Sequence, residues 1–438
     1  MRVCMIGTGY VGLVSGSCLA DFGNAVQCVD INEDTIATLN DGGIPIYEPG
    51  LKDMVARNVR SGRLAFSTNV GDAVKASDVV FIAVGTPAQE DGATNLTYVF
   101  DVAETIAEFL NGYKVVVQKS TVPVGTTREV ARRIKAKVSA DTEFDVVSNP
   151  EFLREGSAVE DFLRPNRVVI GVESDRAEQI MKQVYRPLYL LETPVVLTTL
   201  ETAELTKHAS NAFLATKISF INEIAAICEL VGANVDDVAK GMGLDGRIGP
   251  KFLHAGVGFG GSCLPKDISS LNHLATSRGY VPHIVRAILE LNNGLPDRAV
   301  DKLTIELGSI EGKTIGLLGL AFKPNTDDLR EAPAIRIVKR LLEEKAAAVR
   351  VFDPVAMENF KITGLDVVYC KNAYDVADGC DGLMLVTEWN EFRQLDLPRL
   401  KKVMNEAVFV DCRNVYKPDR LEAYGFRYQS FGRGVAET

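Results

Sequence analysis

The first thirty residues carry the pattern that most constrains the fold of this chain. An apolar segment, Arg2-Val-Cys-Met-Ile6, runs into the turn Gly7-Thr-Gly9-Tyr-Val-Gly12. A helical pattern follows, and then a second apolar segment that ends at Asp30. The order of strand, glycine turn, helix, strand and acid is typical of a Rossmann unit. The N-terminal third is therefore predicted to be a parallel sheet covered by helices.

At each of the three positions in the turn there is a physical reason for glycine. Gly7 permits the tight turn, Gly9 lets the backbone approach a pyrophosphate, and Gly12 lets the helix pack on the sheet. The pyrophosphate is expected at the helix N-terminus, where unpaired N–H groups favour an anion. The first helical turn adds two contact residues, Tyr10 and Val11.

Asp30 selects between two dinucleotides. Its carboxylate is placed to accept hydrogen bonds from the adenosine ribose hydroxyls and to repel a 2′-phosphate. NAD is therefore predicted in preference to NADP.

Three later apolar segments, 78–84, 114–118 and 145–148, continue the sheet. Ligands of such sheets lie beyond the carboxyl ends of the strands. The polar residues that follow these ends are candidate site residues: Thr86, Thr121, Glu151 and Glu155. The alternative is that the threonines cap helices and the glutamates are solvated.

A second constrained stretch surrounds one cysteine, in Gly256-Val-Gly-Phe-Gly-Gly-Ser-Cys-Leu-Pro-Lys-Asp267. Its four glycines tolerate positive φ and let a bulky ligand approach the backbone. A thiol beside the first turn of a helix has its thiolate favoured, and Lys266 acts in the same direction. A lone cysteine is more often a buried small hydrophobe. In this setting Cys263 is the candidate nucleophile and Asp267 a candidate base.

Between these stretches, about 198–231 contains neither proline nor glycine, and its apolar residues recur at helical spacing. A long helix with apolar residues on more than one side often packs across a dimer interface, so a homodimer is expected. Lys207 and Asn211 lie one turn apart on this helix. If that face looks toward Cys263, Lys207 supplies positive charge for an oxyanion. Otherwise it is an ordinary surface lysine.

The last third repeats the layout of the first. Strand patterns at 313–319 and 348–352 are followed by others at 382–386 and 407–410, after a segment, 292–297, whose composition suits a hinge. This second doubly wound domain lacks the full glycine fingerprint, so it binds a nucleotide differently or binds none. Its loops carry basic and aromatic candidates for phosphate and ring contacts, or for salt bridges within the loops: Phe322, Lys323, Arg330 and Arg413.

The chain of 438 residues is long enough for two or three domains. The fold class is α/β, with two doubly wound Rossmann-like domains joined by a helical domain that has a long central helix. The predicted boundaries are 1–197 for the NAD-binding domain, 198–297 for the helical domain with the cysteine stretch, and 298–438 for the second Rossmann-like domain.

Composition excludes several classes of partner. The 48 basic and 58 acidic residues give a net charge of −10 without a basic run, which argues against nucleic acid and anionic membrane as partners. Eight scattered cysteines and four histidines, with no C-x-x-C pair, argue against a zinc site and against a disulfide framework. Because there is also no leader and no apolar run of about 18 residues, a cytoplasmic location is expected.

Together these pieces resemble the nucleotide-sugar dehydrogenases, and among them the branch that oxidises UDP-glucose. The resemblance covers essentially the whole chain and includes specific motifs: Gly7 to Gly12, Ser120-Thr-Val-Pro-Val-Gly-Thr126, Asn149-Pro-Glu-Phe-Leu-Arg-Glu-Gly156, Gly258 to Asp267 and Gly319-Leu-Ala-Phe-Lys-Pro-Asn-Thr-Asp-Asp-Leu-Arg-Glu331. The branch for N-acetylated sugars typically has Pro-Glu-Arg at the third motif. This chain has Pro-Glu-Phe-Leu-Arg-Glu there, so that branch is disfavoured. The GDP-mannose branch shares much of the set, but Gly246-Arg-Ile-Gly-Pro-Lys-Phe-Leu-His-Ala-Gly256 looks more like the UDP-glucose enzymes.

The resemblance implies a four-electron oxidation of the sugar C6 alcohol to a carboxylate, with two NAD. Asp267, through a water held with Thr121, is the implied base for the first oxidation. Cys263 then forms a thiohemiacetal, whose oxyanion Lys207 and Asn211 stabilise, and a second oxidation leaves a thioester. Either Glu155 or Asp267 is the implied base for its hydrolysis.

The resemblance also implies the binding residues. Around NAD it places Asp30, Thr86, Thr121, Glu155, Lys266 and Arg330. Around UDP-glucose it places Glu151, Phe152, Leu153, Arg154, Glu155, Lys207, Asn211, Arg247, Phe252, Leu253, His254, Ala255, Gly256, Gly260, Phe322, Lys323 and Arg413. Arg247 is expected to reach in from the partner subunit.

Two rival readings remain at this point. A regulatory protein that binds NAD and a nucleotide needs no nucleophile. A two-electron dehydrogenase of the 6-phosphogluconate type has a similar layout but needs no thiol in a glycine loop.

Overall fold

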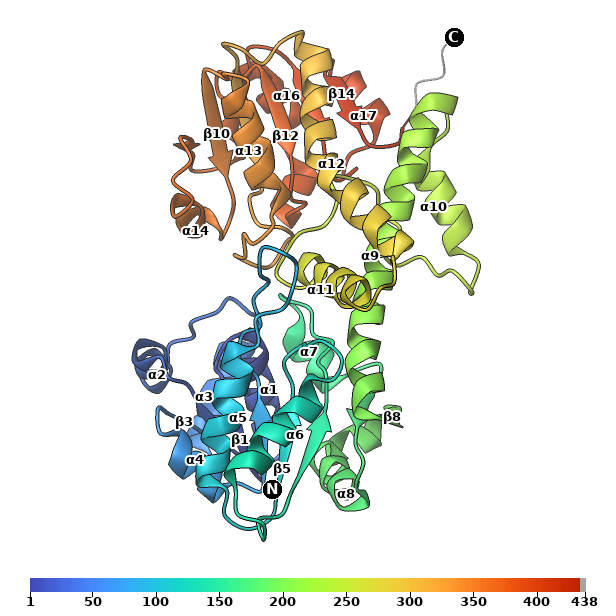
Figure 1. The fold of residues 1–438 in the computed structure, drawn as a ribbon. Coiled ribbons are helices and arrows are strands. Elements are labelled where there is room, and N and C mark those ends of the chain that lie inside the picture. Colours follow the sequence, from blue (N-terminus) through green and yellow to red (C-terminus); the bar gives the residue numbers. More distant parts are fainter. Residues whose placement is uncertain (434–438) are drawn as a thin grey trace. The chain divides into compact units, whose positions relative to one another are not determined.

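The computed structural model describes residues 1–433 and divides the chain into two compact units. Unit 1 comprises residues 1–210 with 269–280, and unit 2 comprises residues 211–268 with the chain from 281 onward. Figure 1 shows one sheet flanked by helices in each unit. The α/β class with two Rossmann-like sheets and a long central helix is thus confirmed.

The sheet of unit 1 has the strand order β3-β2-β1-β4-β5-β6-β7-β8. All neighbouring strands are parallel except β6 and β7. The strands are β1 (Arg2–Ile6), β2 (Ala25–Val29), β3 (Leu64–Ser67), β4 (Val79–Ile82), β5 (Lys114–Gln118), β6 (Phe144–Ser148), β7 (Val168–Gly171) and β8 (Val195–Thr198).

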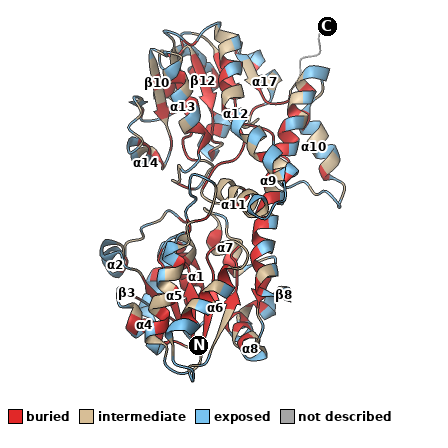
Figure 2. Cartoon of the chain, viewed as in Figure 1, coloured by how far each residue is buried: buried red, intermediate tan, exposed pale blue. Residues whose placement is uncertain are grey.

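The central strands are buried on both faces, as Figure 2 shows for the interior of each sheet. Along β1, Val3 and Met5 join one apolar cluster while Cys4 and Ile6 join another, because successive side chains alternate between faces. Helices on both faces complete the clusters: α1 (Tyr10–Asp21), α2 (Glu33–Asn40), α3 (Leu51–Arg60), α4 (Val70–Ala76), α5 (Thr97–Phe109), α6 (Thr126–Lys137), α7 (Ala158–Leu163), α8 (Asp175–Val184) and the short 3₁₀ helix η1 (Arg186–Leu191).

The sheet of unit 2 has the order β11-β10-β9-β12-β13-β14 and is parallel throughout. Its strands are β9 (Thr314–Leu318), β10 (Ala348–Phe352), β11 (Val368–Tyr369), β12 (Gly382–Leu385), β13 (Val408–Asp411) and β14 (Arg427–Ser430). The helices are α10 (Val235–Gly243), α12 (His283–Leu307), α13 (Pro333–Glu343), α14 (Met357–Lys361), α15 (Ala373–Ala377), α16 (Leu397–Val403) and α17 (Pro418–Ala423), with the 3₁₀ helix η2 (Asn390–Gln394).

Two helices have residues in both units. The long helix α9 (Leu200–Val231) has 32 residues and divides between 210 and 211, and α11 (Leu264–Ser277) divides between 268 and 269. The length of α9 agrees with the prediction from its uninterrupted apolar spacing. Within residues 1–433, no helix combines the length and apolarity that a membrane span requires.

The predicted hinge at 292–297 is wrong. These residues lie inside the 25-residue helix α12, and Pro296 is within it. Gly and Pro weaken a helix interior by about 1 and 3 kcal/mol respectively. Here the following turns bury Leu295, Ala299, Val300 and Leu303 in the core of unit 2, and that burial outweighs the local cost.

Candidate active site

The glycine turn of unit 1 has no room for a side chain at two of its three motif glycines. A Cβ at Gly7, where φ is 100°, would lie 2.5 Å from the Ala83 carbonyl oxygen, and a Cβ at Gly12 would lie 2.0 Å from the Gly7 carbonyl oxygen. Gly9 differs, because a Cβ there would meet nothing within 4 Å. The backbone at Gly9, just before α1 begins at Tyr10, thus faces the open space that a pyrophosphate needs.

Asp30 lies beside this turn. The Thr8 amide and hydroxyl donate to its Oδ2 at 2.7 and 2.9 Å, and the Asn32 amide donates to Oδ1 at 3.0 Å. These bonds hold the carboxylate at the end of β2, where a ribose diol of a bound dinucleotide would meet it. The turn and Asp30 therefore fit NAD, which would lie along the carboxyl ends of the strands.

A buried ion pair of unit 1 joins Glu151, which follows strand β6, to Lys207 of helix α9. Lys207 Nζ is 3.0 Å from Glu151 Oε1, and their side chains are only 4% and 5% exposed. The Lys207 ammonium also lies 5.3 Å from the centre of the Phe152 ring. The alternative interpretation, in which Lys207 is an ordinary surface lysine, is therefore excluded.

The segment after β6 is arranged around Glu151. The Leu153 amide donates to Glu151 Oε2 at 2.5 Å. Arg154 is held outside by the Asp161 carboxylate, and its side chain is 60% exposed. The half-buried Glu155 follows Arg154 in this segment. On the neighbouring strand ends, the Thr86 hydroxyl donates to the Thr121 carbonyl at 3.0 Å, so these two candidates lie together.

In unit 2, the cysteine loop (residues 256–263) follows a path that only glycine allows. Gly258 and Gly261 have φ of 85° and 86°. A Cβ at Gly256 would lie 2.4 Å from the Cys412 carbonyl oxygen, and one at Gly260 would lie 2.2 Å from that of Glu331. Three backbone amides of the loop also donate hydrogen bonds of 2.8–2.9 Å. Gly256 N donates to Asn222 Oδ1, Phe259 N to Asn292 Oδ1 and Gly261 N to the Arg330 carbonyl.

Cys263 ends this loop immediately before α11. Among the eight cysteines, all within the described part of the chain, it alone is half-buried, and the others are buried. Burial raises the pKa of two of those others, Cys28 and Cys380, to about 12, so they remain thiols. The position of Cys263 at the start of a helix and its exposure make it the nucleophile candidate of the chain.

Asp267 lies one turn after Cys263, and its amide donates to the Cys263 carbonyl at 2.9 Å. Its side chain is 1% exposed. The Asn211 amide donates to Oδ2 and the Lys266 ammonium to Oδ1, both at 2.6 Å. The structure therefore brings Cys263, Asp267 and Asn211 together within unit 2, and their catalytic roles stay a prediction.

Arg413 connects the cysteine loop to the second sheet. Its guanidinium donates to the Gly258 and Val386 carbonyls, both at 2.8 Å, and to the Phe322 carbonyl at 3.4 Å. Its Nε also lies 3.4 Å from a Glu388 carboxylate oxygen. Arg413 thus organises the loop as well as being a candidate for phosphate contact.

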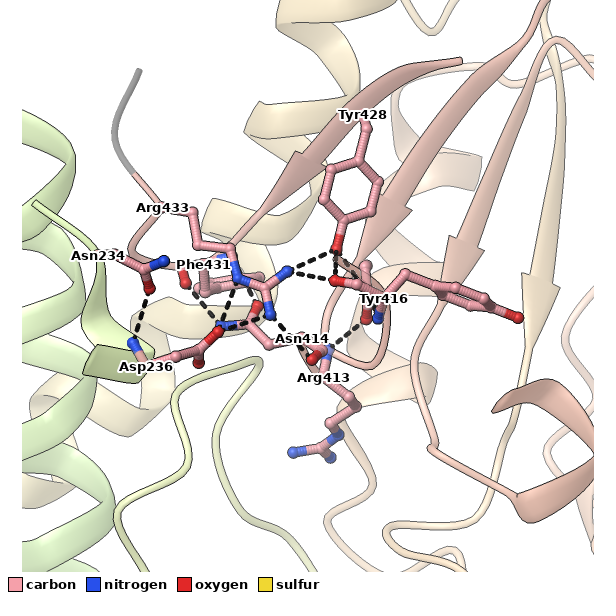
Figure 3. A network of polar contacts seen from close by, with 9 residues as sticks. Asn234, Asp236, Arg413, Asn414, Tyr416, Tyr428, Phe431 and Arg433 are labelled. Atoms are coloured by element: carbon pink, nitrogen blue, oxygen red, sulfur yellow. Dashed lines mark hydrogen bonds and ion pairs between the residues drawn. The ribbon is translucent and has the colours of Figure 1, made fainter. Parts of the chain in front are cut away.

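The turn that carries Arg413 is held by a polar network (Figure 3). The Arg433 guanidinium donates to the carbonyls of Tyr416 and Asn414 and to the Tyr428 hydroxyl, and it pairs with Asp236 at 2.7 Å. In Figure 3 the Arg413 side chain points away from this network. The network therefore fixes the backbone from which Arg413 projects.

The remaining predicted contacts are placed as follows. Arg247 is 90% exposed and pairs with Asp245 at 2.6 Å. Phe252 has a φ of 67° and is half-buried, and His254 is exposed. Leu253 and Ala255 are buried. The last two predicted contact residues are basic. The Lys323 ammonium lies 5.4 Å from the centre of the Phe322 ring, and the Arg330 guanidinium lies 2.7 Å from the Asp328 carboxylate.

Sequence reasoning missed two features of this site. Arg167 stacks on Phe152, with its guanidinium carbon 3.4 Å from the ring centre. Lys119 is buried at the carboxyl end of β5. The signal for Lys119 was its place directly after a strand, beside the candidate Thr121; no pattern in the sequence indicated Arg167.

Comparison with known proteins agrees with this geometry. Three models of the UDP-glucose/GDP-mannose dehydrogenase family match the chain: the NAD binding domain over residues 1–189, the central domain over 201–294 and the UDP binding domain over 316–418. Curated relatives include the UDP-glucose 6-dehydrogenase of Rhizobium meliloti (strain 1021), 53% identical over 99% of this chain and 100% of the relative.

A second curated relative is the UDP-glucose 6-dehydrogenase TuaD of Bacillus subtilis (strain 168), which is 48% identical over 99% of this chain and 93% of its own length. Among solved structures, a UDP-glucose dehydrogenase from the hyperthermophilic archaeon Pyrobaculum islandicum matches with a TM-score of 0.91. It is 39% identical, with 99% of this chain and 98% of that chain covered. This chain therefore belongs to the UDP-glucose/GDP-mannose dehydrogenase family.

Proposed function

We propose that this protein is an NAD-dependent UDP-glucose 6-dehydrogenase, which oxidises C6 of UDP-glucose to the carboxylate of UDP-glucuronate. The observation that carries the proposal is that the cysteine loop follows a path that only glycine permits and ends at Cys263, one helical turn before Asp267, which accepts a hydrogen bond from Asn211. Full-length curated relatives named for the same activity support the choice of substrate.

In this proposal each of three regions of the chain has its own function. Residues 1–197 bind NAD, residues 198–297 carry the dimer helix and the cysteine loop, and residues 298–438 bind the UDP-sugar. The matches to the family's NAD binding, central and UDP binding domains, over 1–189, 201–294 and 316–418, support this division.

The first oxidation removes a hydride from C6, for which NAD held at the glycine turn and Asp30 would supply the acceptor. Asp267, which the Asn211 amide and the Lys266 ammonium orient, takes the hydroxyl proton through a water held with Thr121. The Cys263 thiolate then adds to the aldehyde carbon, forming a C–S bond and an alkoxide. Lys207 and Asn211 stabilise that oxyanion, so the aldehyde stays bound.

Oxidation of the thiohemiacetal by a second NAD leaves a thioester on Cys263. Water attacks the thioester carbonyl, the C–S bond breaks and the thiol is regenerated. The base for this water is Glu155 or Asp267. A single thiol therefore accounts for a four-electron oxidation without release of an intermediate.

The number of NADH molecules formed per UDP-glucose tests the reaction. We expect two, measured by absorbance at the end point with limiting sugar and excess NAD. One NADH per sugar would contradict the thioester route. Activity with GDP-mannose and none with UDP-glucose would assign the chain to the GDP-mannose branch instead.

A homodimer built on α9 is part of the proposal. The half of this helix in unit 2 exposes Phe213 (65%), Phe220 (43%), Ile227 (47%) and Leu230 (86%), more apolar surface than a solvated helix favours. A partner subunit covering this face would also provide its own Arg247, an exposed side chain, to the substrate bound by the first subunit.

We therefore expect twice the mass of one chain by analytical ultracentrifugation. Phe213→Glu, which places a charge in the proposed interface, is expected to give monomers. Ile362→Glu, at an 83% exposed position outside α9, is the matched control and is expected to stay dimeric. A monomeric wild-type protein would remove the dimer from the proposal.

The location we propose is the cytoplasm, where eight free cysteines remain reduced.

A further inference from the structure

A buried lysine that the proposed mechanism does not use lies next to the Glu151–Lys207 pair. Lys119 directly follows β5 and is 4% exposed. Its ammonium lies 3.1 Å from Asn149 Oδ1 and 3.3 Å from the Tyr185 hydroxyl. The ring centres of Phe162 and Tyr185 lie 5.9 and 5.8 Å away. A charge in such a place needs a reason, because burying an ammonium is costly.

The contacts of Lys119 tie three strand ends together. Asn149, which follows β6, accepts from Lys119 and from the Tyr185 hydroxyl, the latter at 2.6 Å. Its own amide donates to the Val169 carbonyl of β7 at 2.8 Å. Asn149 is also two residues before Glu151. Lys119 therefore anchors the start of the segment 149–155, which holds the candidate substrate residues.

The same ammonium acts on the ion pair electrostatically. Burial lowers the pKa of Lys119 to about 8, while the Glu151 carboxylate raises it and the Lys207 ammonium lowers it. The adjoining cavity is also lined by Asp161, Arg164 and Arg167, and burial raises the pKa of the Tyr185 phenol. Lys207 is thus the ion-pair partner of Glu151, while the Lys119 ammonium is held by Asn149 and Tyr185.

We propose that Lys119 is a positioning residue for the oxidation: it anchors Asn149 and with it the segment 149–155, so that Glu151 holds Lys207 in place. The inference rests on the proposed function, since it gives Lys207 its role. Loss of the Lys119 donor would free Asn149 and the start of this segment, so the placement of Lys207 and with it kcat should suffer, while the NAD site at the glycine turn stays intact.

The test compares Lys119→Met with Lys114→Met. Lys114 is at the other end of β5, is 3% exposed, and its ammonium donates to the carbonyls of Ser77 and Lys75. Both substitutions remove one buried ammonium from the same strand. We expect only Lys119→Met to lower kcat, by about tenfold, because Glu151 and Lys207 lose their placement, with the KM for NAD unchanged. Lys119→Arg, which keeps a cationic donor for Asn149, should restore kcat.

Equal kcat values for the two methionine variants would overturn the inference, as would a kcat that Lys119→Arg leaves as low as Lys119→Met does. Should Lys119→Met not fold, as judged by circular dichroism, Tyr185→Phe removes the hydroxyl that donates to Asn149 and accepts from Lys119; a lowered kcat with an unchanged KM for NAD then supports the inference and an unchanged kcat overturns it. Two NADH per UDP-glucose from the wild type, together with a wild-type kcat in Lys119→Met, would overturn the inference alone. A wild type that forms no NADH overturns the proposed function and, with it, this inference.

Discussion

Replacing Cys263 with serine is expected to lower kcat on the order of a thousandfold or more, since the residue is the proposed nucleophile of a covalent route. A serine hydroxyl is almost the same size as the thiol but is far less acidic, so it provides almost no anion to attack the aldehyde. Because Cys263 is half-buried at the end of the cysteine loop, the substitution should leave the fold intact.

The measurement is steady-state NADH formation from UDP-glucose, with mass spectrometry of the protein to detect a covalent sugar adduct. Cys370→Ser is the control. Cys370 is buried in unit 2, where its thiol lies 3.7 Å from the Val368 carbonyl, and its loss should leave kcat nearly unchanged. A Cys263→Ser variant with full activity would refute the nucleophile assignment and leave a two-electron dehydrogenase as the better description.

Asp267→Asn is expected to lower kcat by about two orders of magnitude, as loss of a general base typically does. The amide keeps the size of the carboxylate but cannot accept the proton of the C6 hydroxyl. It also loses the charge that attracts the Lys266 ammonium at 2.6 Å. Since the side chain of Asp267 is 1% exposed, solvent cannot substitute for it.

The comparison is with Asp301→Asn, which removes a carboxylate from unit 2 in an exposed pair with Arg340 at 2.5 Å. Exposed pairs contribute about 0–1 kcal/mol, so this control should retain full activity. Single-turnover measurement of the first NADH separates the first oxidation from thioester hydrolysis. If Asp267→Asn forms the first NADH at the wild-type rate, Asp267 is not the base of that step.

Much of the site was predictable from local sequence. The glycine turn, Asp30 and the cysteine loop are short motifs in which each residue type has a steric or electrostatic reason, and the structure shows those reasons directly. Gly7 and Gly260 have no space for a Cβ. The pairing of Asn211 with Asp267 joins residues 56 positions apart, and it was anticipated only because the resemblance grouped them as catalytic residues.

Other contacts depend on packing that no local pattern encodes. Arg167 stacks on Phe152 and Arg433 supports the turn of Arg413 because the fold brings separate segments together. Neither arginine stands in a motif, and a surface arginine is the ordinary expectation for both. Such contacts become visible only when the strand ends are assembled.

By itself, the sequence determined the two sheets, the long helix and the candidate nucleophile, because periodicity, glycine placement and strand-end chemistry act over short distances. Tertiary structure alone decided two further matters. Burial of an apolar stripe carried α12 through Gly294 and Pro296, where composition predicted a hinge. The meeting of three strand ends placed the Lys119 ammonium beside Asn149 in a buried position, where a single charge affects its neighbours far more strongly than it does in solvent.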